Sequence, residues 1–128
     1  MKKSEFDNRP QLVTDEGKDV LISFDIEAVE KESPAMDGGE PVVREVFEAY
    51  TVRVDKPVER SKVIDAIITA EYPNDRMQAV VNNYLATPKD AERKAEFEAM
   101  QEWRAHSKDV ADEVMAAVQG AEEQAGGS

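Results

Sequence analysis

The stretch DVLISFDIEAV, residues 19–29, decides the fold class of this chain. Apolar side chains occupy every second position from Val20 to Ala28, and most of the positions between them are polar. A period of two is typical of a β-strand that turns one face toward a core. We therefore expect a strand at 19–29, with an apolar face that other elements must cover.

A second strand is expected from about residue 42 to residue 54, after a loop at 33–41 that is rich in proline and glycine. Its valine and tyrosine side chains share one parity, which Glu48 interrupts, while Phe47 and Ala49 take the other parity. This mixed pattern indicates a β-bulge or a strand that is partly covered on both faces. Because the two strands are neighbours in the sequence, an antiparallel hairpin is the simplest pairing.

The rest of the chain predicts three helices, at about 57–71, 75–85 and 87–120. Pro57 is expected in the first turn of the first helix, where its missing N–H is not needed. Thr87 and Pro88 resemble the N-cap and the first position of the third helix. No helix-breaking residue then follows before Gly120.

The length of the third helix leaves three arrangements open. About 31 helical residues span roughly 46 Å, whereas a compact domain of this size is roughly 34 Å across. The helix either packs end to end against both shorter helices, or breaks near Ser107, or has its distal apolar stripe covered by another chain.

These elements predict an α+β domain, an antiparallel β-hairpin followed by three helices of which the last is long. The folded unit is expected at 19–119. Residues 1–18 and 120–128 carry few apolar side chains, so we expect mobile tails at both ends. An extra short strand within 1–18 remains an alternative.

Composition narrows the classes of partner. The chain has 128 residues and a formal net charge of −12, which disfavours nucleic acid and anionic membranes as partners. It has no cysteine and no long apolar run, so we expect a cytoplasmic protein without a membrane span. The acidic residues either only solvate the surface or face a basic partner.

The residues offer little support for catalysis. His106 is the only histidine, and Glu102, Asp109 and Glu113 share its helix face, which we expect to be solvated. One helix supplies too few ligands for a metal site. We therefore expect no catalytic residue, no cofactor and no metal ion, and a protein that is not an enzyme.

Two groups of residues are candidates for an interaction surface. The first is the distal stripe of the last helix, Val110, Val114 and Val118. The second, at the end of the second helix, is Asn82, Asn83 and Tyr84, although the asparagines could instead cap that helix. The expected partner is another protein, or a second copy bound through the distal helix or the hairpin edge.

The segments IITAEYPNDRMQAVVNNYL (67–85) and EFEAMQEWRA (96–105) resemble small uncharacterised proteins from prophage regions of gut bacteria. Some of those proteins lie near tail genes. The resemblance covers only part of the helical half, and it implies no catalytic residue. It implies an accessory or assembly role in a bacterial phage or mobile element.

The sequence thus favours a non-catalytic interaction or assembly module. The alternative is an acidic mimic of nucleic acid that inhibits a DNA-binding enzyme. The mimic requires a continuous carboxylate field on the last helix that the neighbouring cations do not neutralise. The carboxylates concerned are Glu92, Glu96, Glu102, Asp109, Asp112 and Glu113.

Overall fold

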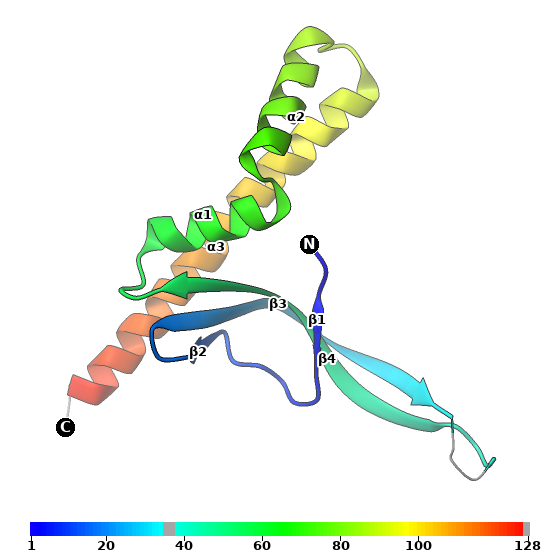
Figure 1. The fold of residues 1–128 in the computed structure, drawn as a ribbon, viewed down its shortest axis with the longest axis vertical. Helices are drawn as coiled ribbons and strands as arrows, with labels where there is room; N and C mark the ends of the chain where they lie inside the picture. Colours follow the sequence, from blue (N-terminus) through cyan, green and yellow to red (C-terminus); the bar gives the residue numbers. More distant parts are fainter. Residues whose placement is uncertain (35–37, 127–128) are drawn as a thin grey trace.

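The computed structural model describes residues 1–34 and 38–126, with side chains as far as residue 121. Within this range the chain is an α+β fold, a β-sheet followed by three helices of which the last is long, as the sequence predicts (Figure 1). The strands are β1 Ser4–Phe6, β2 Val13–Asp15, β3 Asp19–Ser33 and β4 Val42–Asp55. The helices are α1 Arg60–Glu71, α2 Asn74–Ala86 and α3 Ala91–Gly126. Residues 35–37 of the expected loop and residues 127–128 lie outside the described part.

The described strands form one antiparallel sheet in the order β1-β4-β3-β2, so the expected hairpin of β3 and β4 is its centre. The register of these two strands shifts between Phe24 and Glu27, where two residues of β3 face the single residue Ala49 of β4. The irregularity that the sequence indicated for the second strand therefore lies in the first. A bulge bends its strand and increases the local twist, so it changes the direction of the sheet at this point.

One face of the sheet packs against α1 and α3 and forms the main core (Figure 1). Cross-strand neighbours Ile22 and Val52 of the sheet, together with Val63 and Ile67 of α1, are buried in this cluster. Their burial follows from the alternation in the strand and from the wide apolar arc of α1.

A second, smaller cluster joins α2 to the first half of α3, and it contains Tyr72, Val80 and Met100. In Figure 1 these two helices form an antiparallel pair that projects away from the sheet. In the described chain, no helix is long and apolar enough to cross a membrane.

The long helix is unbroken and packs along both shorter helices, which is the first of the three arrangements left open. Ser107 does not break it, and the buried Oγ of this residue is satisfied by a hydrogen bond that it donates to the Trp103 carbonyl one turn earlier (2.8 Å). The helix also passes Gly120, where the sequence predicted a tail, and continues to Gly126.

The predicted start of the third helix is wrong by one turn. Thr87 ends α2, since its N–H donates to the Asn83 carbonyl at 3.1 Å. Asp90 is the residue that caps α3, because its carboxylate accepts from the backbone N–H groups of Glu92 (2.9 Å) and Arg93 (3.2 Å). Aspartate is among the best N-caps, so either residue satisfied the sequence pattern.

The expectation of a mobile tail at 1–18 is also wrong. This segment holds both edge strands, so the alternative of an added strand is right, and there are two. Each has three residues, too few to show a periodic pattern in the sequence. They form because β3 and β4 offer unpaired backbone edges to which a short segment can bond.

Candidate functional site

The first predicted interaction group is not a free surface. Val110 and Val114 are 3% and 0% exposed and belong to the main core under the sheet. Only Val118 remains half-buried, in a groove of about 670 Å³ that Leu12, Val58 and other apolar residues also line. The stripe is therefore covered by the chain's own strands, and no second chain is needed to bury it.

The second predicted group lies far along the α2–α3 pair. Asn82 and Asn83 are exposed, whereas Tyr84 stacks on Phe97 with ring centroids 4.3 Å apart and planes 7° from parallel. At the end of the helix, the backbone N–H and the hydroxyl of Thr87 both donate to the Asn83 carbonyl. The structure does not bring this group together with the distal stripe.

The far half of the hairpin, whose edge the sequence analysis named as a possible interface, forms an arm. Beyond the bulge, residues 27–33 of β3 and 42–48 of β4 form a two-stranded ribbon that extends away from the helices (Figure 1). Of the other described strands, only β1 reaches it, pairing with β4 at Phe47, Glu48 and Ala49. The backbone edges of the rest of the arm have no described strand beside them.

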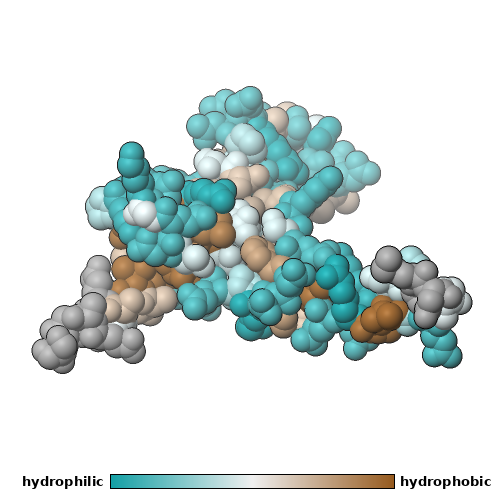
Figure 2. Space-filling view, turned by 60° about the horizontal axis from the view of Figure 1, so that its bottom comes forward, coloured by the Kyte–Doolittle hydropathy of each residue, from teal (hydrophilic) through white to brown (hydrophobic). Residues whose placement is uncertain are grey.

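The far end of the arm also carries exposed apolar side chains. Val42 and Val43 are 60% and 54% exposed. In Figure 2, apolar surface is visible at the same end of the molecule as the arm, among hydrophilic side chains. Open strand edges with apolar side chains are the usual template for strand addition by another chain.

Repulsion between like charges destabilises the pairing of the two strands in the arm. Three of its directly opposed pairs carry like charges, namely Glu27 with Glu48, Glu30 with Glu45, and Lys31 with Arg44. Like charges in directly opposite positions destabilise a strand pair by up to about 1 kcal/mol each. A sequence selected only for the stability of this hairpin would alternate the signs.

On one face of the arm, charges from β1 and the loop after it compensate this repulsion. Lys31 pairs with Glu5 and lies 3.6 Å from Glu48, while Arg44 lies 3.4 Å from Glu5 and 3.3 Å from Asp7. The hydrogen bond from Lys31 lowers the pKa of Glu5 below its usual value. The same bond raises the pKa of Lys31.

The other face is acidic and uncompensated. Glu30, Glu32 and Glu45 share it by strand parity, and all three are exposed. In the part of the chain that the structure describes, none of the three forms an ion pair. We call these three residues the acidic face of the arm. The signal for it was present in the sequence, because from Glu27 onward both parities of the strand carry charged residues, which is typical of a strand whose two faces both reach solvent.

The sole histidine lies at the base of the arm. The sequence analysis expected it on a solvated helix face, but it packs against β3 instead. His106 is half-buried, and its Nε2 lies 2.8 and 2.9 Å from the two carboxylate oxygens of Asp25. Asp25 is a bulge residue with φ of 54°, a left-handed conformation that few residues other than glycine adopt. The rings of Phe24 and Trp103 lie 6.2 and 5.9 Å from the imidazole. The pair therefore ties α3 to the point where β3 changes direction.

Among the described residues, no serine hydroxyl is hydrogen-bonded to His106. Ser23 is fully buried and its Oγ has no hydrogen-bond partner in the described structure. However, strand alternation places Ser23 on the sheet face opposite Phe24, and Phe24 is the residue that packs toward α3 and His106. No group of three or more histidine, aspartate or glutamate residues that could hold a metal ion occurs among the described residues.

The carboxylate field that a nucleic-acid mimic would need is interrupted. Arg93 lies 3.3 Å from Glu96, and Arg60 of α1 lies 2.7 Å from Asp112. Two of the six carboxylates of the expected field are therefore paired with cations.

Comparison with protein-family models, with curated proteins and with solved structures found no match to this chain.

Proposed function

We propose that this chain is a non-catalytic docking module, which uses the β3–β4 arm to bind an extended basic segment of another protein. The observation that carries the proposal is the acidic face of the arm, Glu30, Glu32 and Glu45, whose exposed carboxylates form no ion pair among the described residues and lie on a strand pair with open edges. The resemblance to prophage proteins suggests assembly of a phage or mobile element as the setting.

Strand addition supplies the affinity in this proposal. An incoming strand would bond to the unpaired backbone edge of residues 27–33, and its alternate side chains would lie over the acidic face. Lysine or arginine at those positions would relieve the repulsion between Glu30 and Glu45. The repulsion between these glutamates destabilises the arm in the free protein, and a basic partner would remove that repulsion in the complex.

A second copy of the chain fits this surface less well. Joining two arms edge to edge would bring two acidic faces into one sheet, and like charges across neighbouring strands repel. The net charge of −12 adds a long-range repulsion between copies. We therefore expect light scattering to give a mass near 14.3 kDa at every concentration.

The direct test is a titration of the isotope-labelled protein with two short peptides, one alternating lysine and valine and the other glutamate and valine, followed by amide NMR. The lysine peptide should shift the amides of residues 27–33 and 42–48 in a saturable way, and its affinity should fall with added salt. The glutamate peptide should produce no saturable shift.

A matched pair of variants separates the acidic face from net charge. Replacing Glu30, Glu32 and Glu45 by glutamine should abolish binding of the lysine peptide. Replacing Glu59, Glu92 and Glu113 by glutamine changes the net charge equally but leaves the arm intact, so binding should persist. Equal losses in both variants, shifts confined to the helices, or a concentration-dependent dimer would refute the proposal.

A further inference from the structure

A hollow on the helical side of the sheet has an unusual lining. It measures about 380 Å³ and lies between β4, the end of α1 and the middle of α3. Three aromatic rings line it, those of Tyr50, Tyr72 and Trp103, and two carboxylates join them, those of Glu71 and Glu102. The rings of Tyr50 and Trp103 meet edge-on, with centroids 5.7 Å apart and planes at 86°.

The walls of the hollow are held in place by the fold. The indole N–H of Trp103 donates to the Ile67 carbonyl at 3.0 Å, which fixes the plane of that ring. Tyr72 is buried in the α2–α3 cluster. His106 also lines the hollow, and its Nε2 is held by Asp25 on the other side. A site with fixed walls loses little entropy when a ligand enters.

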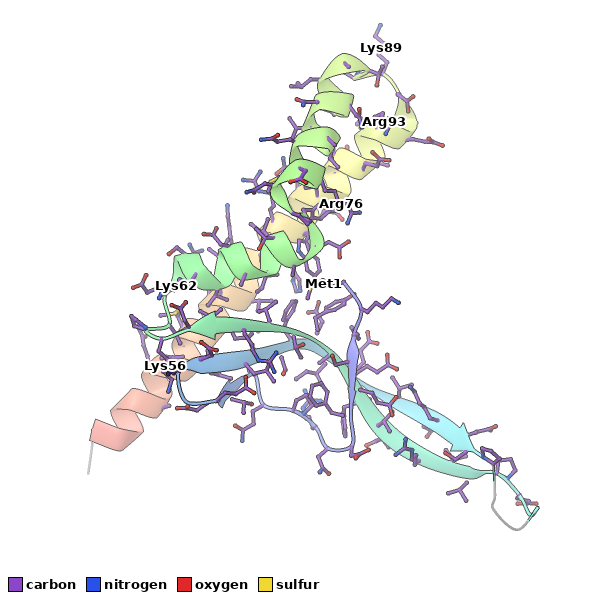
Figure 3. All side chains as sticks on the ribbon, viewed as in Figure 1. Met1, Lys56, Lys62, Arg76, Lys89 and Arg93 are labelled. Carbon is purple, nitrogen blue, oxygen red and sulfur yellow. The ribbon has the colours of Figure 1, made fainter. Side chains whose placement is uncertain are left out.

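Cations of the chain itself already occupy the rim. The Lys3 ammonium lies 5.1 Å from the centre of the Tyr50 ring, and the Arg76 guanidinium carbon lies 4.7 Å from the centre of the Tyr72 ring. Arg76 also lies 3.2 Å from Glu71, and the ammonium group of Met1 donates to the same carboxylate. Figure 3 places Met1 and Arg76 near the junction of α1 and α2, and Met1 is one of the residues that line this hollow.

We infer that this hollow is a binding site for an alkylammonium group. Aromatic faces attract a cation through the ring quadrupole, and the attraction is stronger where water is excluded. Glu71 is already paired with Arg76 and with the Met1 ammonium, so the opposite charge left for a ligand is that of Glu102, which forms no ion pair among the described residues. Two of the three rings that line the hollow, those of Tyr50 and Tyr72, already contact a cation of the same chain. The inference is independent of the arm and of its proposed partner.

An ammonium ligand has two sources, a free diamine or the side chain of a lysine in a partner. Cadaverine and a blocked glycine-lysine-glycine peptide are therefore titrated separately, at constant ionic strength. Trp103 is the only tryptophan in the chain, so its fluorescence reports directly on the hollow. We expect a saturable change with at least one of the two probes, and the tighter one identifies the source.

Two matched pairs of variants make the test specific. Glu102→Gln should weaken binding about tenfold, because a bond to a charged group is lost, while Glu98→Gln, one turn away and 4.0 Å from Lys94, should leave it unchanged. Lys3→Ala should tighten binding about threefold by removing the competing cation over Tyr50. Lys2→Ala, an exposed lysine, should have no effect.

Three results would overturn the inference: no saturable change with either probe, a change that sodium chloride alone reproduces, or equal affinities in Glu102→Gln and Glu98→Gln. Circular dichroism of each variant shows whether the fold is retained. Lys3 also lies 3.3 Å from Glu27 of the arm, so the arm is tested separately, with other variants and a different readout.

Discussion

Replacing Asp25 by glycine should change the stability of this protein in opposite directions, depending on whether His106 is present. Two effects compete at this bulge residue. Its left-handed backbone, with φ of 54°, favours glycine. Its carboxylate holds the imidazole of His106 across the boundary between the sheet and α3.

The structure sets the size of each effect. A residue other than glycine costs about 1 kcal/mol in this conformation, at the lower end of the range because aspartate tolerates it. Replacement by glycine removes this cost, but about half of the gain in stability is lost because glycine gives the unfolded chain more conformational freedom. The side chains of Asp25 and His106 are 31% and 39% exposed, so we take about 1.5 kcal/mol for their interaction, the low end for a charged hydrogen bond.

Asp25→Gly should therefore destabilise the native protein by about 1 kcal/mol and stabilise the His106→Ala variant by about 0.5 kcal/mol. Urea denaturation of the four proteins of this double-mutant cycle gives both values and the coupling energy. Asp25→Asn serves as a control, because asparagine tolerates the same backbone conformation but lacks the charge. The reasoning fails if Asp25→Gly has the same effect in both backgrounds, within the roughly 0.3 kcal/mol expected of independent sites.

Other substitutions test other parts of the fold. Trp103→Ala should cost about 3 kcal/mol in chemical denaturation, because the ring packs on both clusters, and a loss below about 1 kcal/mol would contradict that placement. Asp90→Ala should cost about 1 kcal/mol by removing the cap of α3, and an unchanged unfolding midpoint would argue against the observed cap. Ser23→Ala should stabilise the protein by about 1 kcal/mol, because it removes a buried hydroxyl that has no partner, so a loss of stability would reveal a hidden bond. The pKa of Glu71 is lowered from its usual 4.5 chiefly by the hydrogen bond from the Met1 ammonium. Its contribution to stability is therefore complete above the unfolded pKa and is lost as the pH falls through the lower folded pKa. Glu71→Gln should flatten the dependence of the unfolding midpoint on pH below about 4.5, and an unchanged slope would show that this bond does not contribute.

The exposure of the acidic face of the arm could be predicted from the sequence, but the pairing of its like charges could not. Charges on both parities after Glu27 already indicate that both faces of the strand reach solvent. Whether the opposed residues repel depends on the register, which the bulge between Phe24 and Glu27 shifts by one residue. A shift of one residue exchanges the two faces of a strand, so the pairing of Glu30 with Glu45 could not be read from the sequence.

The sequence alone determined the elements with a long local period. The alternation of β3, the apolar arc of α1 and the stripe of α3 follow from the backbone geometry of single elements, which neighbouring residues report directly. The tertiary structure alone decided which alternative α3 adopts and where the short edge strands bond. It also brought His106 to Asp25, 81 residues away. Such contacts depend on sheet twist, on the bulge and on backbone edges offered by distant segments, none of which leaves a periodic trace in the chain.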